Sequence, residues 1–416
     1  MTFVEGMGQL PERWRVERAR WLLSRKRRPV PAEAGVVTAF RDGQVTLRQN
    51  RRTDGFTEAI QEFGYQGVRK GDLVVHAMDG FAGAIGVSDS DGKSSPVVHV
   101  YTASDDVDLR FVAYVLRHLA GAGFVSSLAK GIRERSTSFD PATLARLMLP
   151  VPPLHEQRRI ADFLDAETAR IDRLLRLRQR QGDLERCRLL ARISEIYEKA
   201  TRQSAAVRLG YLLRSIEQGW SPQCEDRLAE DHEFGVLKAG CVNGGIFRPK
   251  EHKALPAAVK PRTEYIVRPG DLLMSRASGS LDLIGSAAVL PAEVPTNLIL
   301  CDKVYRLRML PSVDPHFVAL MLRSHPIREA IKLGTSGAEG MANNLPTRTI
   351  RDLRMPLISS DEQRRFAAAL HDQEGDVAQA VSLLNRSTSL MRERREALIA
   401  AAVTGQVDVA TTRGAA

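Results

Sequence analysis

The sequence predicts an α+β chain with two mixed α/β domains, separated by two long helices that pack as an antiparallel coiled coil, and an internal pseudo-two-fold repeat. Three observations predict this class. Sequence blocks recur in the same order in the two halves of the 416 residues. Two stretches carry the heptad spacing of long helices. Short β-branched stretches bounded by Gly, Asp and Ser come before each of them.

The repeat is clearest in two segments, PPLHEQRRIADFL from Pro152 and ISSDEQRRFAAAL from Ile358. Both carry Glu-Gln-Arg-Arg at the same place, 206 positions apart. Three further pairs of blocks lie upstream in the same order: TLARLMLPVP with TIRDLRMPLI, FVAYVLR with FVALMLR, and VRKGDLVVHAMDGFAGAIG with VRPGDLLMSRASGSLDLIG. Outside these blocks no alignment is convincing. The chain is therefore predicted to contain two divergent copies of one unit, each a globular part followed by a long helix.

This division predicts five consecutive ranges along the chain. They are a first globular domain at 1–150, a first spacer helix at 151–203, a second globular domain at 204–356, a second spacer helix at 357–405 and a C-terminal tail at 406–416.

The second spacer helix has clear start and stop signals. Ser359 or Ser360 can cap its N-terminus, and Glu362 and Gln363, each three residues further on, complete possible capping boxes. Apolar residues then recur every seven positions until Gly405, a residue typical of helix ends. The heptad positions are Leu370, Val377, Leu384, Met391 and Leu398.

The first spacer helix begins after Pro152 and Pro153 and runs towards Ala200. The polar stretch 176–183 interrupts its apolar seam, and Gly182 permits a bend there. The seam is predicted at Ile160, Leu164, Ile171 and Leu174 before the interruption and at Leu184, Cys187 and Leu190 after it. Helices of roughly 60–70 Å need a long apolar partner, and each other is the economical choice. Packing of each helix on its own domain is the alternative.

Each globular part is predicted to be mixed α/β. The first has strands at 72–78, 83–88 and 96–101 and a helix at 109–120. The second has strands at 271–276, 284–290 and 303–308 and a helix near 314–323. The local pattern predicts no order for these strands within a sheet.

The chain is basic, with a net charge of +10 and a pI near 9.6. Residues 1–52 alone hold twelve Lys and Arg against five Asp and Glu. A polyanionic partner is the specific interpretation, and solvated basic faces are the general one. The four cysteines contain no CxxC pair, which predicts neither a zinc ribbon nor a disulfide framework. The N-terminus has no apolar signal core and no run reaches the ~20 apolar residues of a membrane span, so a cytoplasmic location is predicted.

No pattern predicts a catalytic site or a metal site. His155 and Glu156 begin an HExx motif, but Arg159 stands where a zinc protease has its second histidine. The glycine-rich stretch at 86–94 has one residue too many for a P-loop. Neither a GxSxG elbow nor the Asn/Asp-Pro-Pro-aromatic motif of an amino-methyltransferase occurs. Asp72 and Asp271 lie in matching Gly-Asp-Leu turns, where a turn-forming role before a strand is the favoured interpretation.

The repeated helix entrances resemble those of the specificity subunits of Type I restriction-modification systems, and the resemblance extends over nearly the full chain. It rests on LPVPPLHEQRRIADFLDAETARIDRLL at 149–175, on the related stretch at 355–384 and on REALIAAAVTGQVDV at 395–409. The chain departs from the family pattern at the second entrance, which has Ile-Ser-Ser-Asp in place of Pro-Pro-Leu, and at the polar stretch of the first helix.

The resemblance implies a non-catalytic subunit that binds double-stranded DNA through two target-recognition domains, at 1–150 and 204–356. Each would read one half of a bipartite site. The spacer helices would dock two methyltransferase (modification) subunits, and restriction subunits would join them. S-adenosylmethionine, ATP and Mg are expected on the partner subunits and not on this chain. Because the globular parts differ while the helix entrances do not, we expect the two half-sites to be unlike and the site to be asymmetric.

Candidates for DNA contact are donor residues near loop tips, because phosphates and base edges are bound by side chains of Arg, Ser, Asn and similar residues. In the first domain they come from GIRERSTS at 131–138. In the second they come from the loop after the strand at 271–276 and from GTSGAEGMANN at 334–344. An exposed, solubilising role is the alternative for each. The candidates are Arg133, Arg135, Ser136, Arg276, Ser278, Ser336, Asn343 and Asn344.

A second set of candidates serves the helix seam and partner docking. These residues lie at the two repeated entrances and along the heptad positions. They are Glu156, Gln157, Ile160, Leu164, Glu362, Gln363, Leu370, Val377, Leu384, Met391 and Leu398.

Three alternatives to this function stay open. A nuclease or methyltransferase in its own right is disfavoured by the missing motifs. A coiled-coil scaffold with no DNA role is disfavoured by the Arg-rich N-terminus and the paired α/β domains. A specificity subunit of another restriction-methylation type fits the same residues.

Overall fold

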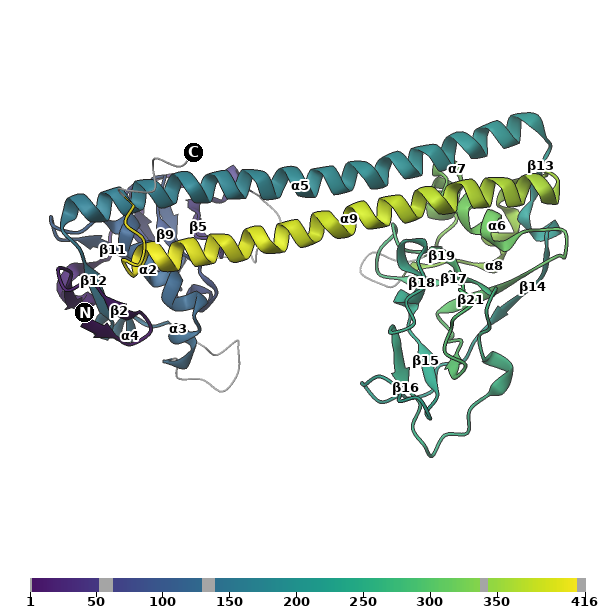
Figure 1. Cartoon of the computed structure of the whole chain (residues 1–416), viewed down its shortest axis with the longest axis horizontal. Helices are drawn as coiled ribbons and strands as arrows, with labels where there is room; N and C mark the ends of the chain where they lie inside the picture. Colours follow the sequence, from purple (N-terminus) through teal and green to yellow (C-terminus); the bar gives the residue numbers. More distant parts are fainter. Residues whose placement is uncertain (1, 52–62, 129–138, 337–342, 410–416) are drawn as a thin grey trace. The chain divides into compact units, whose positions relative to one another are not determined.

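The computed structural model describes residues 2–51, 63–128, 139–336 and 343–409. The chain divides into two compact units (Figure 1). The first unit comprises residues 1–178 and 386–416, and the second unit comprises residues 179–385. Each unit therefore holds one α/β part together with part of each long helix. The five ranges predicted along the sequence follow a different principle, because they separate helices from globular parts, and they stay a prediction.

The two long helices are α5 (Leu154–Gln203) and α9 (Ser360–Val403), where the heptad spacing predicts them. Helix α5 continues without a break through the polar stretch 176–183. Gly182 is buried there, and a Cβ built on it would lie 3.8 Å from Cδ1 of Leu384 on α9. Gly182 thus faces the partner helix, with room for a methyl group at ordinary van der Waals distance. None of the helices in the described ranges is long and apolar enough to cross a membrane.

The long helices pack against each other in opposite directions within each unit. In the first unit Ile160 and Leu164, near the start of α5, share a core with Ile399, near the end of α9. In the second unit Ile193, near the end of α5, shares a core with Leu370, near the start of α9. The predicted antiparallel coiled coil is confirmed (Figure 1).

The seam of α5 differs from the prediction at four positions. Leu174 is exposed, so the seam predicted before the interruption is wrong at that residue. Leu184, Cys187 and Leu190 are also exposed, so the predicted restart of the seam is wrong. Eighteen residues make five full helical turns. Leu189 therefore lies on the same face of α5 as Ile171, and both are buried. On α9, Leu370 is buried and the later heptad positions are half-buried, namely Val377, Leu384, Met391 and Leu398.

Each α/β part is built on a four-stranded antiparallel sheet, and the strand order is the same in both. It is β4-β11-β8-β9 in the first unit and β14-β21-β17-β19 in the second. The strands are β4 (Leu23–Lys26), β8 (Leu73–His76), β9 (Ile85–Val87), β11 (Val98–Ala103), β14 (Leu213–Gln218), β17 (Leu272–Ser275), β19 (Ala287–Val289) and β21 (Val304–Met309). The helices α2 (Leu109–Gly121) and α6 (Pro315–Met321) follow β11 and β21. The predicted strands and helices are confirmed, while β4 and β14 were not foreseen.

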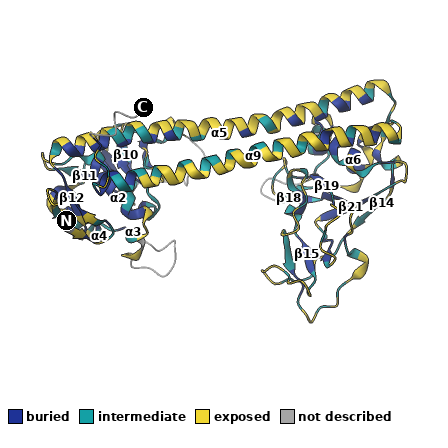
Figure 2. Cartoon of the chain, viewed as in Figure 1, coloured by how far each residue is buried: buried dark blue, intermediate teal, exposed yellow. Residues whose placement is uncertain are grey.

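The two faces of each sheet belong to different cores, as the alternation of side chains along a strand requires. Leu73 of β8 faces the core that contains α2 and the long helices, and its neighbour Val74 faces a second core. In the second unit, Leu272 of β17 faces the core that contains α6 and the long helices, and Leu273 faces a second core. Figure 2 shows the sheets of both units largely buried, while the long helices are exposed along much of their length.

We call the parts that pack on the helix-free faces the outer lobes. The first outer lobe contains β5 (Val37–Ala39), β6 (Val45–Leu47), β7 (Gln66–Val68) and β10 (Gly92–Ser94). The second contains β15 (Gly235–Leu237), β16 (His252–Ala254) and β20 (Leu298–Ile299). These strands lie almost entirely outside the repeated sequence blocks. The similar halves of the two copies thus face the helices, and the dissimilar halves form the lobes.

Short elements complete each unit. A two-stranded ribbon precedes each long helix: β3 (Arg15–Arg18) pairs with β12 (Met148–Val151), and β13 (Ala206–Arg208) pairs with β23 (Arg354–Pro356). The remaining described elements include β1 (Thr2–Val4), β2 (Gly8–Leu10), α1 (Ala19–Leu22), α3 (Phe124–Ser127), α4 (Pro141–Arg146), α7 (His325–Leu333) and α8 (Thr347–Asp352).

A buried glutamine ties the start of α5 to the first α/β part. The Gln157 Nε2 donates to the carbonyls of Asp106 at 3.0 Å and Pro152 at 2.8 Å. Its Oε1 accepts from the N–H of Asp108 at 2.9 Å. Asp108 is the N-cap residue of α2, so the glutamine connects the first turns of two helices.

The second unit repeats this anchor. The Oε1 of Gln363 accepts from the N–H of Asp314 at 2.8 Å, and its Nε2 donates to the carbonyl of Ile358 at 3.0 Å. Asp314 is the N-cap residue of α6. Both glutamines belong to the repeated Glu-Gln-Arg-Arg. An intrachain anchor therefore accounts for this part of the repeat, and the docking role of Gln157 and Gln363 stays a prediction.

The anchor predicts a local loss of stability when a glutamine is truncated. Gln157→Ala leaves the N–H of Asp108 without its acceptor, and an unsatisfied buried group costs about 1–3 kcal/mol. We expect the free energy of unfolding of the first unit to fall by about this amount. Hydrogen exchange should speed up in residues 109–121 and stay unchanged in residues 315–321. Gln363→Ala should do the reverse.

The matched control is Gln373→Ala, because Gln373 is an exposed glutamine on α9. We expect it to change neither segment. Equal protection of residues 109–121 in wild type and Gln157→Ala would contradict the anchor.

Candidate nucleic-acid interface

Five of the eight predicted DNA-contact residues lie together in the second unit, although they come from separate segments. Strand β18 (Ala277–Ser278) pairs with β22 (Asn343–Asn344) in antiparallel register. The N–H of Ser336 donates to the carbonyl of Asn344 at 2.9 Å, and the N–H of Asn344 donates back at 2.8 Å. The carbonyl of Arg276 accepts from the N–H of Leu345 at 2.8 Å. We call Arg276, Ser278, Ser336, Asn343 and Asn344 the polar strip.

The polar strip offers both donors and acceptors. Ser336 is exposed, while Ser278, Asn343 and Asn344 are half-buried. Serine hydroxyls and asparagine amides can each donate and accept a hydrogen bond. Base edges carry both kinds of group, and phosphates carry acceptors. The strip therefore has the chemistry of a DNA-reading surface, and contact of these five residues with DNA stays a prediction.

The side chain of Arg276 makes two contacts with other residues of the second unit. Its Nη1 donates to the carbonyl of Asp302 at 3.2 Å, and its guanidinium carbon lies 6.0 Å from the ring centroid of Tyr305. The hydroxyl of Tyr305 donates to the carbonyl of Leu345 at 3.3 Å. A guanidinium has five N–H groups, so these contacts orient the side chain without using all its donors. Arg276 thus connects the polar strip to the start of β21.

The three predicted contacts of the first domain, Arg133, Arg135 and Ser136, lie outside the described residues. The described part of the first outer lobe instead holds an arginine-lined cavity of about 600 Å³. Its charged and imidazole side chains are Arg41, Asp42, Arg48, Arg51, His76 and Asp79. The sequence-based prediction missed them because no local pattern marks them. The only signal was the excess of basic residues in 1–52.

Ion pairs order this cavity. Arg41 pairs with Asp79 at 2.8 Å, and Arg51 pairs with Asp42 at 2.8 Å. The backbone N–H of Asp79 donates to Nδ1 of His76 at 3.0 Å, so the proton of the neutral ring sits on Nε2. Burial lowers the pKa of His76, which keeps the ring neutral near pH 7. The cavity thus combines fixed cations, carboxylates and a neutral donor.

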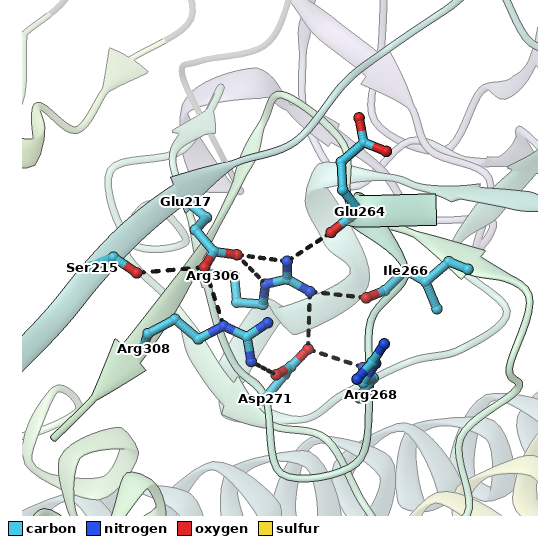
Figure 3. Close-up of polar contacts among 8 residues, drawn as sticks. All are labelled: Ser215, Glu217, Glu264, Ile266, Arg268, Asp271, Arg306 and Arg308. Carbon is cyan, nitrogen blue, oxygen red and sulfur yellow. Dashed lines mark hydrogen bonds and ion pairs between the residues drawn. The ribbon is translucent and has the colours of Figure 1, made fainter. Parts of the chain in front are cut away.

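A buried ion-pair network lies between the sheet and the outer lobe of the second unit (Figure 3). Arg306 on β21 is 3% exposed. Its Nε donates to Glu217 at 2.7 Å, and its Nη1 contacts Asp271 at 3.3 Å. The same guanidinium donates to the carbonyls of Ile266 at 2.9 Å and Glu264 at 3.1 Å. One arginine therefore fixes the segment that leads from the outer lobe into β17.

Arg308 completes the network by donating to Asp271 at 2.6 Å and to Glu217 at 3.2 Å. Burial opposes the ionisation of Glu217, but the hydrogen bonds and charges of Arg306 and Arg308 outweigh it. The pKa of Glu217 consequently lies below its ordinary value. At the position that matches Arg306, the first unit has Val100 in an apolar core. The second unit thus has a buried arginine in its sheet where the first unit has a valine, while the equivalent aspartates Asp72 and Asp271 pair with an arginine in both units.

Asp72 and Asp271 both make the predicted turn. The N–H of Arg69 donates to Asp72 at 2.7 Å, and the N–H of Arg268 donates to Asp271 at 2.9 Å. Asp72 also pairs with Arg28, as Asp271 pairs with arginines of β21. In the described part of the chain, no group of three or more His, Cys, Asp or Glu side chains is placed to hold a metal ion.

Several curated proteins share sequence with this chain. It is 25% identical over 167 residues to the Type I restriction enzyme EcoEI specificity subunit of Escherichia coli, over 40% of this chain and 28% of that protein. It is 25% identical over 250 residues to the EcoKI specificity subunit of Escherichia coli strain K12, over 56% of this chain and 52% of that protein. The StySPI specificity subunit of Salmonella potsdam is 24% identical over 183 residues, 44% of this chain and 38% of that protein. The chain is a relative of the Type I specificity subunits. It spans about half the length of these relatives or less.

The fold agrees with that relationship. A chain of a solved structure described as the structural basis underlying complex assembly and conformational transition of the type I R-M system superposes with a TM-score of 0.69. It is 19% identical, and the match covers 96% of this chain and all of that one. No protein-family model matches the chain.

In this relative of the Type I specificity subunits, the two glutamates of the repeated entrances have different surroundings. Glu156 is buried and accepts from Arg13 at 2.8 Å. Glu362 is exposed and forms the predicted capping box: the N–H of Ser359 donates to its carboxylate at 3.1 Å, and its own N–H donates to the Ser359 hydroxyl at 3.3 Å. Docking of a partner at either glutamate stays a prediction.

The ion-pair network predicts unequal costs for its two arginines. Arg306→Ala leaves two carboxylates without their buried cation, and breaking a buried pair costs about 3–5 kcal/mol. We expect the free energy of unfolding of the second unit to fall by about that amount. Arg308→Ala is the matched comparison, because that side chain is 37% exposed, and we expect a loss of at most about 1 kcal/mol. Chemical unfolding of both variants is the measurement, and equal losses would contradict the assignment of Arg306 as the anchor.

Proposed function

We propose that this chain is a sequence-specific DNA-binding subunit that reads an asymmetric bipartite DNA site and directs methyltransferase and restriction subunits to it. The observation that carries the proposal is the selective duplication. Both units have the same sheet order, the same glutamine anchor and the same helix entrance, while their outer lobes differ. A scaffold that holds two unlike lobes suits a site with two unlike halves.

The chemistry of the two α/β parts supports this proposal. The net charge of +10 favours a polyanion. The polar strip of the second unit and the arginine-lined cavity of the first offer donors and acceptors of the kinds that DNA requires. In this proposal the domains at 1–150 and 204–356 are the two target-recognition domains.

The long helices support the proposed partners. Monomeric proteins bury most large apolar side chains, and exposed groups of them mark contact surfaces. Several leucines of α5 and α9 are exposed, namely Leu174, Leu177, Leu184, Leu190, Leu383 and Leu390. We propose that two methyltransferase subunits dock on these helices and that restriction subunits join the assembly. In this proposal catalysis, S-adenosylmethionine, ATP and Mg reside on the partners, this chain is non-catalytic, and the complex acts in the cytoplasm.

The test is to produce the chain with its methyltransferase subunits in a host and to map methylated adenines across the genome. We expect one interrupted, asymmetric motif with a modified adenine in each half. Asn343→Ala should relax or abolish recognition of one half only, whereas Ser382→Ala, an exposed residue of α9, should leave the motif unchanged. An uninterrupted or palindromic motif would contradict the proposal.

Affinity for the mapped site should depend strongly on salt. Each phosphate contact releases counterions, so we expect affinity to fall by at least about tenfold between roughly 50 and 200 mM salt. Fluorescence anisotropy with a labelled duplex measures this. A flat response would mean that the positive charge of the chain serves another purpose.

A further inference from the structure

A fifth repeated block becomes visible in the structure. RARWLLSR from Arg18 and RLGYLLRS from Arg208 are 190 positions apart and occupy the same place in the two units. The N–H of Ala19 donates to the carbonyl of Leu147 at 2.9 Å, and the N–H of Leu209 donates to that of Leu353 at 2.7 Å. Each block thus ends the ribbon that precedes a long helix. It escaped sequence comparison because it is short and has its own offset.

Each block exposes one large aromatic side chain. Trp21 is 68% exposed and Tyr211 is 71% exposed. The guanidinium carbon of Arg20 lies 4.9 Å from the centroid of the Trp21 ring. Trp and Tyr combine an apolar ring with a hydrogen-bond donor, and they are enriched at interfaces for that reason. An exposed aromatic residue thus stands at the same place in both copies.

In the second unit this aromatic lines a basic cavity of about 460 Å³. Its lining residues are Arg208, Gly210, Tyr211, Thr347, Arg348, Arg351 and Asp352. Asp352 is the one carboxylate in this lining. Its Oδ1 lies 3.7 Å from Nη1 of Arg208, and its Oδ2 lies 3.8 Å from Nε of Arg348. The three arginines therefore leave an excess of two positive charges. Arg348 is 94% exposed, so its guanidinium faces solvent.

Gly210 permits the close packing that forms this cavity. A Cβ on Gly210 would lie 3.1 Å from Cβ of Arg351 and 3.2 Å from its carbonyl oxygen. The helical turn 209–211 therefore lies directly against α8, which carries Thr347, Arg348 and Arg351.

The first unit has a corresponding surface. Arg18 stands at the position of Arg208, and Trp21 stands at that of Tyr211. Arg20 lies over the Trp21 ring and is exposed, as is Arg18. Helix α4 is the counterpart of α8, but it has Ala142 and Ala145 at the positions of Arg348 and Arg351, and its exposed Arg146 stands at the position of Asp352. We call these two surfaces the arginine–aromatic patches.

We infer that the arginine–aromatic patches bind the phosphate backbone of the DNA duplex, one patch for each half of the bipartite site. The inference rests on the proposed function. Phosphate oxygens accept hydrogen bonds from arginine N–H groups, from Ser, Thr and Tyr hydroxyls and from the indole N–H, and the patches supply these donors. The only carboxylate of the second patch lies beside two of its arginines.

The duplication itself points to phosphate and away from bases. The backbone presents the same phosphates at every base pair, so contacts to it can be alike at two unlike half-sites. Contacts to base edges must differ between those half-sites. One arginine and one aromatic residue of the patches recur in both units, Arg18 with Arg208 and Trp21 with Tyr211, whereas the outer lobes do not recur. Retention in both copies is therefore the pattern expected of a backbone contact.

The test compares two double variants, Arg18→Ala/Arg20→Ala and Arg348→Ala/Arg351→Ala, in the assembled complex with its methyltransferase subunits. The probes are a duplex with the mapped site and a duplex with that site scrambled. We expect each double variant to lower affinity for both duplexes by a similar factor, on the order of tenfold per lost contact. The slope of log affinity against log salt should decrease in magnitude by about 2.

Three controls make the result decisive. Arg364→Ala/Arg392→Ala removes two exposed arginines of α9. Where this variant assembles as wild type does, it should change neither quantity. Arg348→Lys/Arg351→Lys keeps the charge and should keep the salt slope. Unfolding curves should match wild type, because all four substituted patch residues are exposed.

Other outcomes overturn the inference in distinct ways. An unchanged salt slope with weaker assembly of the complex would show that the patches bind a protein partner. A changed base preference would show that they read sequence. Unchanged binding and assembly would show that they have no such role. Absence of any site preference in the wild-type complex would instead refute the proposed function.

Discussion

The hydrogen bonds of two glutamines are the contacts on which the organisation of this chain depends. Gln157 and Gln363 each join the first turn of a long helix to the N-cap of the helix that covers the sheet. Both donor and acceptor groups of each side chain are used within the chain. The buried apolar residues Ile160 and Leu164 of α5 and Leu370 of α9 turn one face of each helix to a core. The anchor adds directional hydrogen bonds to these contacts and ties the start of each helix to one point of the α/β part.

The two faces of the sheet in each unit contact different parts of the chain. One face packs against α2 or α6 and the long helices, and this core includes residues of the repeated blocks such as Leu73 and Leu272 together with residues outside them such as Tyr101 and Leu307. The other face supports an outer lobe, and the means of attachment differ. The first unit has the apolar Val100 and the ion pair of Arg28 with Asp72, and the second has the ion pairs of Arg306. Because each face has its own core, the lobes can change without altering the packing of the helices.

Local patterns in the sequence predicted secondary-structure elements. They did not predict features that depend on contacts between segments far apart in the sequence. Heptad spacing and capping residues gave both long helices, since helix formation follows local periodicity and end signals. The seam after Gly182 was wrong because the glycine was interpreted as an interruption, while the structure buries it against Leu384. The strand order and the pairing of Ser278 with Asn343 depend on chain segments far apart in sequence, which no local pattern encodes. The buried Arg306 could not be foreseen for the same reason, because its partners come from three separate segments.

The division between repeated and divergent surfaces has a consequence for how such a chain changes its target. Contacts to phosphates supply affinity that is independent of sequence, and contacts to base edges supply discrimination. If the repeated patches around Trp21 and Tyr211 provide the first and the outer lobes provide the second, then a substitution in a lobe changes the preferred bases while the chain still binds DNA. The two halves can diverge separately, because each lobe has a core of its own. Within this proposal, duplication followed by change in the lobes alone is sufficient to turn a symmetric site into an asymmetric one.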